Sequence, residues 1–185
     1  DEVDELLKEA EEVIREVTRE HKRLLDEARK ISEENKKRSE ESNREVRELV
    51  RRIKEEIKKG LPEEDLKRLL DELRDMIRKV RETNERSDKE VEKVVRDILR
   101  RLRELNKRVE EIIRRILKEI RRDVRDSEKA KRVEEELKKL LDKLSRITEE
   151  VERRLEELLK DNERVSRESD EELKRILEDV ERDTR

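Results

Sequence analysis

The side chain best suited to proton or metal chemistry in this sequence is its single histidine, His21. Histidine has an ordinary pKa close to neutral pH, so it can serve as an acid, a base or a metal ligand. A carboxylate metal site in a helical bundle needs a Glu-x-x-His pair, but the residue three before His21 is Thr18. No second histidine and no cysteine completes a ligand set. We therefore interpret His21 as a member of a hydrogen-bond network.

The other chemically capable residues show no catalytic arrangement. No serine has a histidine within helical reach on the same face, so a hydrolase triad is not supported. The single glycine excludes a Gly-rich phosphate loop. Carboxylates are abundant, but they lie near Lys and Arg at helical spacing, as Glu55 does near Lys59, and this is typical of surface ion pairs. We expect no catalytic residue, no cofactor, no metal site and no bound small molecule, and hence no enzyme.

The remaining chemistry is hydrogen bonding. Asn, Ser and Thr interrupt three long series of Leu, Ile and Val, at steps of three or four residues that place them on the same helical face. The main polar layer is predicted to contain Asn35, Ser39, Ser42, Thr83, Asn84, Ser87, Asn162, Ser166 and Ser169. A smaller second layer is predicted to contain Thr18, His21, Asn106, Ser145 and Thr148.

Three helices of nearly equal length must position these side chains. The apolar steps predict helices over residues 2–59, 63–125 and 127–184. The mean step is close to about 3.6 residues, so we expect nearly straight helices. Short loops make neighbouring helices antiparallel. The predicted fold class is therefore all-α, an up-down-up antiparallel three-helix bundle that forms one domain over residues 1–185.

The residues between the predicted helices support these boundaries. Gly60 suits a left-handed C-cap, and Pro62 suits the first turn of the next helix. Val124 ends the second apolar series, and Asp126 or Ser127 suits the N-cap of the third helix.

Residues that are equidistant from a tight turn should face each other across it. This geometry brings the amides and hydroxyls of all three helices to one level. The pairs predicted in this way are Asn35 with Ser87, Ser39 with Thr83, Ser87 with Ser166, and Asn84 with Ser169.

A polar layer inside a bundle adds less stability than leucine would, because a buried hydrogen bond nets only about 1 kcal/mol. Its use is to penalise a wrong register, since a helix that slides by one turn leaves polar atoms facing apolar ones. A competing interpretation starts new helices at these positions, which would divide the bundle into six shorter helices. It rests on three capping-box patterns, namely Ser42-x-x-Glu45, Ser87-x-x-Glu90 and Ser169-x-x-Glu172.

The composition narrows the class of protein. Charged residues make up 60% of the chain and hydrophobic residues 29%, but the charges nearly balance, with 54 basic and 57 acidic residues. Balanced charge and regular apolar spacing favour a folded chain over a disordered one. The absence of a basic face and of aromatic residues argues against nucleic acid and membrane surfaces as partners. No apolar run exceeds two residues, so we expect no membrane span and no signal peptide.

Over its whole length the chain resembles computationally designed helical bundles with buried hydrogen-bond networks. The features shared with that class are the Glu/Lys/Arg surface, the Leu/Ile/Val stripe, the KGLPEED turn, the lack of aromatic residues and Gln, and the aligned Asn/Ser/Thr layers. Natural three-helix repeats of the spectrin type share the topology but usually carry Trp and Gln. The resemblance implies a structural scaffold without natural biochemical activity, and recombinant expression in the cytoplasm.

The oligomeric state follows less directly from the pattern. The apolar stripe is wide enough for a three-helix core, which predicts a monomer. Two alternatives remain open: a groove that binds a partner helix, and a homo-oligomer. A natural cytoskeletal coiled coil is a further interpretation.

Overall fold

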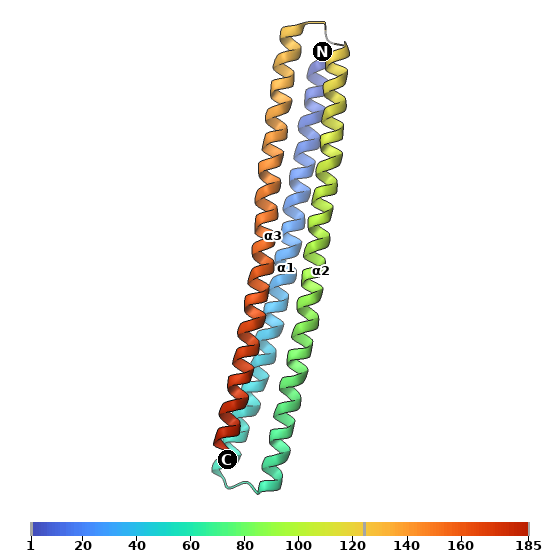
Figure 1. Cartoon of the computed structure of the whole chain (residues 1–185). Coiled ribbons are helices and arrows are strands. Elements are labelled where there is room, and N and C mark those ends of the chain that lie inside the picture. The colour runs from blue at the N-terminus through green and yellow to red at the C-terminus, as the bar shows by residue number, and fades with distance from the viewer. Residues whose placement is uncertain (1, 124, 185) are drawn as a thin grey trace. The chain divides into compact units, whose positions relative to one another are not determined.

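Three helices make up almost all of the residues that the computed structural model describes, which are 2–123 and 125–184. They form a three-helix bundle (Figure 1), so the predicted fold class is confirmed. Val124 lies outside the described residues. The helices are α1 (Glu2–Lys58), α2 (Glu63–Asp123) and α3 (Ser127–Asp183).

The caps explain where the helices begin and end. Gly60 has a φ of 83°, the left-handed conformation expected of a glycine C-cap. Pro62 lies one residue before α2 rather than inside its first turn, and its carbonyl accepts two backbone N–H groups of that turn. Asp126 is the N-cap of α3, because its Oδ1 accepts the backbone N–H groups of Glu128 at 3.1 Å and Lys129 at 3.3 Å.

The helices continue without interruption through the polar positions. The interpretation of Ser42, Ser87 and Ser169 as starts of new helices is therefore wrong. No Gly or Pro lies near these serines to break the helix, so the backbone N–H groups keep their partners one turn earlier. A capping box describes a local pattern, and here the helical hydrogen bonds on both sides override it.

The chain divides into two compact units, each of which contains a segment of all three helices. Unit 1 consists of Asp1–Arg29 and Val94–Glu157, and unit 2 consists of Lys30–Lys93 and Leu158–Arg185. The expectation of a single domain over residues 1–185 stays a prediction.

Unit 1 has a core of aliphatic side chains from the three segments. Its members come from the apolar stripes of the sequence at steps of three or four residues, and fully burying a side chain such as Leu137 contributes about 1.5–3 kcal/mol. The buried members are Val3, Ala10, Ile14, Val17, Val109, Ile113, Ile116, Ile120, Val133, Leu137 and Leu144.

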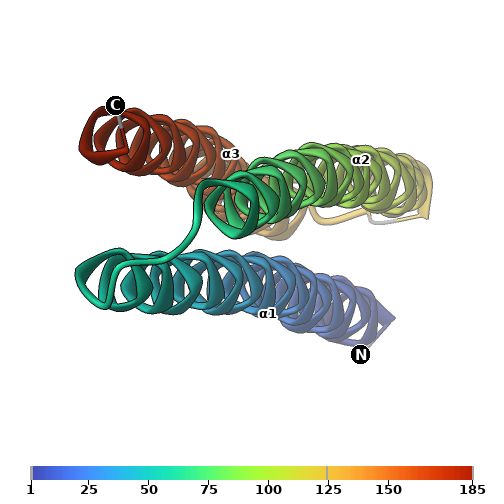
Figure 2. The same ribbon diagram turned by 90° about the horizontal axis from the view of Figure 1, so that it is seen from below.

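Unit 2 has an aliphatic core of its own. The turn that joins α1 to α2 belongs to this unit (Figure 2). Ion pairs show how its segments run. Lys36 pairs with Asp161 and Arg47 pairs with Glu172, which makes α1 and α3 parallel. The buried members of the core are Val46, Leu49, Ile53, Leu73, Ile77, Leu173 and Val180.

Within the described part of the chain no large hydrophobic side chain is exposed. None of the helices there contains an apolar stretch long enough to cross a bilayer.

Candidate functional site: two buried polar layers

The main polar layer lies in unit 2 and contains two hydrogen-bonded chains of side chains. The first chain centres on Asn35 of α1, which is 5% exposed. Its Nδ2 donates to Asn162 Oδ1 on α3 at 2.8 Å and to Asp88 Oδ1 on α2 at 3.1 Å. Ser166 Oγ on α3 donates to the other carboxylate oxygen of Asp88. One amide of α1 therefore binds both neighbouring helices, and a carboxylate ends the chain.

The second chain also joins all three helices. Asn84 Nδ2 on α2 donates to Ser169 Oγ on α3 at 3.3 Å, the pair expected from their equal distances to the second loop. Ser169 Oγ donates to Asn43 Oδ1 on α1 at 3.1 Å, and Asn43 Nδ2 donates to Glu172 Oε2 at 3.2 Å. Arg47 pairs with the same glutamate at the surface. The chain thus begins at a buried amide and ends at a solvated ion pair.

Charged side chains flank this layer. Arg38 Nη1 donates to Ser87 Oγ at 3.1 Å, which gives the buried serine a partner from α1. Lys36 pairs with Asp161, and the hydrogen bond from this ammonium group is the main reason that the pKa of Asp161 is lowered. Both contacts lie at the edge of the layer, where Arg38 is exposed and Lys36 is partly exposed.

The small polar layer lies in unit 1 and has three members, one from each helix. Asn106 Nδ2 on α2 donates to Thr148 Oγ1 on α3 at 2.8 Å. His21 Nε2 on α1 lies 3.1 Å from the same hydroxyl oxygen. The His21 side chain is fully buried, Thr148 is buried and Asn106 is half-buried.

The environment of His21 favours the neutral imidazole. Its pKa is lowered because burial disfavours the imidazolium form, and this outweighs the opposing effects of the Val17 carbonyl and the Asn106 side chain. A neutral ring has one donor and one acceptor nitrogen. Nε2 bonds to Thr148, whereas Nδ1 is buried without a hydrogen bond of good geometry. Either tautomer therefore leaves one ring nitrogen unpaired.

Four buried side-chain atoms have no hydrogen-bond partner among the described residues. Two of them, His21 Nδ1 and Asn106 Oδ1, belong to the small layer. The other two, Ser32 Oγ and Asp170 Oδ1, lie in unit 2 but outside its two hydrogen-bonded chains. An unpaired buried polar atom costs about 1–3 kcal/mol, so the small layer is the less satisfied of the two.

Some predicted members do not join these networks. Ser145 is exposed, because Leu144 and Thr148 occupy the inward face and Ser145 follows the first of them by about 100° of helical rotation. Thr18 Oγ1 donates to the Ile14 carbonyl of its own helix at 2.8 Å instead of bonding to another helix. Ser42 is only half-buried, since the inward position belongs to Asn43.

Ser39 is buried and Thr83 is half-buried, and both lie outside the hydrogen bonds that join the helices. The predicted pair of Ser39 with Thr83 is therefore not brought together by a hydrogen bond. The predicted members of the main layer that form hydrogen bonds between helices are Asn35, Asn84, Ser87, Asn162, Ser166 and Ser169.

Sequence reasoning missed three members of the main layer: Asn43, Asp88 and Glu172. Asn43 was detectable, because a step of four from Ser39 fits a helix as well as the step of three to Ser42. Asp88 and Glu172 are charged residues at the edge of the stripe and look like ordinary surface residues in a chain this rich in charge. Their positions could have indicated their role, because Asp88 directly follows Ser87 and Glu172 lies about one helical turn after Ser169.

The arrangement joins side chains of all three helices through hydrogen bonds. Among residues 2–123 and 125–184, no three His, Cys, Asp or Glu side chains are grouped to hold a metal ion. His21 has a hydroxyl and an amide beside it, and the carboxylates of Glu152 and Glu20 act on the ring only as nearby charges.

Comparisons with known proteins agree with this description of the fold. No protein-family model matches the sequence, and no curated protein matches it. The chain is similar to a solved structure described as a computationally designed three helix bundle, with 14% sequence identity and a TM-score of 0.65 over 98% of this chain and 87% of that one. At this identity the likeness shows the fold that the two chains share.

Proposed function

We propose that this chain is a designed structural scaffold without natural biochemical activity, in which the buried polar layers specify the register of the helices. One chain supplies segments of all three helices to each aliphatic core. Three independent features support this function: the designed neighbour of the same fold, the cross-helix hydrogen bonds and the sequence traits shared with designed bundles.

The observation that carries the proposal is the contact of Asn35 with both other helices. Its amide nitrogen is within hydrogen-bonding distance of Asp88 on α2 and Asn162 on α3 at the same time. A shift of α3 by one turn moves Asn162 by about 5.4 Å along the helix axis, well beyond hydrogen-bonding distance. When the shift brings Leu159 to the place of Asn162, the amide of Asn35 faces an aliphatic side chain.

The energetic argument concerns the difference between registers. The correct register gains about 1 kcal/mol for each buried hydrogen bond, whereas a shifted register leaves several polar atoms unpaired at about 1–3 kcal/mol each. An apolar layer of Leu, Ile and Val would accept either register. The polar layers therefore add discrimination rather than stability.

The test removes the whole first chain at once, so that no partner stays unpaired. We expect this fourfold variant to unfold at the same or a higher temperature than the parent, because leucine packs in place of the polar groups. Its register should become less strictly fixed, because only the second chain and the small layer then oppose a shift of the helices. The variant carries Asn35→Leu, Asp88→Leu, Asn162→Leu and Ser166→Ala.

Register is measured directly by the distance between two spin labels. The chain has no cysteine, so Glu40→Cys on α1 and Arg167→Cys on α3 introduce labels at exposed positions within unit 2. The parent should give one narrow distance, and the fourfold variant should give a broad or double distribution. A single unchanged distance in the fourfold variant would contradict the proposal.

A matched control adds apolar surface without touching the layer. Glu34→Leu, Arg86→Leu and Glu163→Leu change exposed residues next to layer members. This control should keep the narrow label distance, which separates loss of the layer from a general increase in hydrophobicity.

A further inference from the structure

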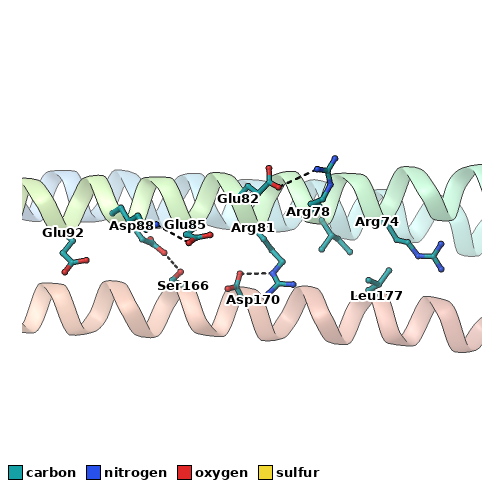
Figure 3. A pocket seen from close by; sticks show the side chains of 12 residues that line it. Arg74, Arg78, Arg81, Glu82, Glu85, Asp88, Glu92, Ser166, Asp170 and Leu177 are labelled. Carbon is teal, nitrogen blue, oxygen red and sulfur yellow. Dashed lines mark hydrogen bonds and ion pairs between the residues drawn. The ribbon is translucent and has the colours of Figure 1, made fainter.

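A groove lies between α2 and α3 in unit 2, with a volume of about 640 Å³. Its apolar surface includes Ile77 of α2 and Leu177 of α3. Figure 3 shows its polar walls, in which side chains of α2 face Ser166 and Asp170 of α3.

The α2 wall has a regular order of charge. Six side chains follow each other at steps of three or four residues, so they form one stripe on the helix. The first three are basic and the last three are acidic. In chain order they are Arg74, Arg78, Arg81, Glu85, Asp88 and Glu92.

The charges of this stripe are complementary to those of a second, antiparallel copy of the stripe. Its positions are symmetric about Thr83, at two, five and nine residues on either side, and each basic residue has an acidic one at the same distance. Two further lining residues lie beside the stripe and form ion pairs within α2. Glu82 pairs with Arg78 at 3.7 Å, and Lys89 pairs with Glu85 at 3.4 Å.

We propose that this groove binds the same segment of a second copy of the chain, with the two α2 helices antiparallel and a two-fold axis at Thr83. In this arrangement each arginine lies opposite a carboxylate of the copy: Arg74 opposite Glu92, Arg78 opposite Asp88, and Arg81 opposite Glu85. The two-fold axis makes every such pair occur twice. A helix of unrelated sequence would have to match the same basic and acidic halves by chance.

Two of the three arginines have their present partners at the exposed surface. Arg74 pairs with Glu181 and Asp71, and Arg78 pairs with Asp75, while the two arginine side chains are 49% and 63% exposed. Exposed ion pairs contribute little, so they can be exchanged for pairs across the interface at small cost. The resulting dimer should be weak, reversible and sensitive to salt.

Asp170 provides a second, independent reason for a donor to enter this groove. Its Oδ1 is buried without a hydrogen bond, and Arg81 Nε lies 3.7 Å from it (Figure 3). A donor that approaches through the groove would supply the missing hydrogen bond and remove the free-energy cost of an unpaired buried acceptor.

The experiment measures the mass of the full chain by analytical ultracentrifugation, from micromolar to millimolar concentration, in low and in high salt. We expect the weight-average mass to rise from 22.8 kDa toward twice that value at high concentration in low salt, and to stay at 22.8 kDa in high salt. A mass of 22.8 kDa under every condition would overturn the proposal and leave the groove to a helix of another protein.

Charge reversal tests the pairing itself. Arg74→Glu alone and Glu92→Arg alone should each abolish the rise in mass, because each puts like charges opposite each other twice. An equal mixture of these two variants should associate again, since each chain then supplies the opposite charge that the other needs. A mixture that associates no better than its components would refute the antiparallel arrangement.

The matched control is Arg100→Glu, which changes the net charge by the same amount as Arg74→Glu at an exposed arginine of unit 1. It should associate as the parent does, and an equal loss of association there would assign the effect to net charge. Thermal unfolding followed by circular dichroism checks that every variant is folded. The scaffold function is tested by label distances within one chain, so the two tests can fail independently.

Discussion

The two polar layers use the same kinds of side chain but differ in how their hydrogen bonds end. In the main layer one chain ends at Asp88 and the other at the Glu172–Arg47 pair, so charged groups at the edge accept the last hydrogens. In the small layer His21 and Asn106 both converge on Thr148, and each keeps one unpaired buried atom.

The difference teaches where a buried network must end. An amide carries two donors and one oxygen acceptor, so a network of neutral groups alone tends to finish on an atom without a partner. A half-buried carboxylate solves this problem, because it accepts several hydrogens and remains in contact with water. The small layer has no such terminal group among its three members.

The largest expected effect comes from breaking the main layer at a single point. Asn35→Leu removes one amide but leaves Asn162 Oδ1 and Asp88 Oδ1 without it. We expect the free energy of unfolding to fall by about 2–3 kcal/mol, because unpaired buried polar atoms cost about 1–3 kcal/mol each and leucine packing returns only part of this. Urea denaturation measures the change.

The same position also provides the control for this loss. In the fourfold variant described above, the partners of Asn35 are replaced together with it, so the penalty should vanish. Equal destabilisation by the single and the fourfold changes would contradict the role assigned to unpaired partners.

Removal of the small layer should have a smaller effect of the opposite sign. His21→Leu, Asn106→Leu and Thr148→Val together eliminate two unpaired buried atoms and add apolar surface. We expect the free energy of unfolding to rise by about 1–2 kcal/mol, since apolar replacement of all partners is neutral or stabilising. Urea denaturation next to the fourfold variant compares the two layers, and a loss of stability here would mean that the small layer is better satisfied than its contacts indicate.

The smallest expected effect is a dependence of stability on pH. The pKa of His21 is lowered from 6.5 in the folded protein, mainly by burial. Above 6.5 the ring is neutral in both the folded and the unfolded chain, so it contributes no change. As the pH falls below 6.5, the unfolded chain takes up a proton that the folded chain resists, and the free energy of unfolding decreases until the folded pKa is passed.

Two measurements check this effect. An NMR titration of the His21 ring should show a midpoint below the ordinary value of about 6.5. The variant without the small layer should lose this part of the pH dependence, because the main layer contains no histidine. A midpoint at or above the ordinary value would show that the ring reaches water.

Much of the fold followed from the spacing of apolar residues. Steps of three or four residues predicted three long helices, and Gly60 and Asp126 marked two of their ends. The level at which Asn35, Asn84 and Asn162 meet the other helices also followed, because residues equidistant from a turn must face each other.

The exact membership of each layer did not follow. Ser42 and Asn43 are both compatible with a helical step, and the choice between them depends on the rotation of α1 against α3. The same uncertainty affected Ser145, which is exposed because a rotation of about 100° separates it from the inward-facing Leu144. Asp88 looked like one more surface charge until α1 and α3 placed Asn35 and Ser166 beside its two oxygens.

The sequence by itself determined three helices, their approximate ends and the level of the polar side chains, because all of these depend on local spacing along one chain. Only the tertiary structure decided which donors meet which acceptors and which atoms stay unpaired. Hydrogen bonds require agreement within a few tenths of an ångström between side chains on different helices, and helical periodicity specifies a face only to within about one residue.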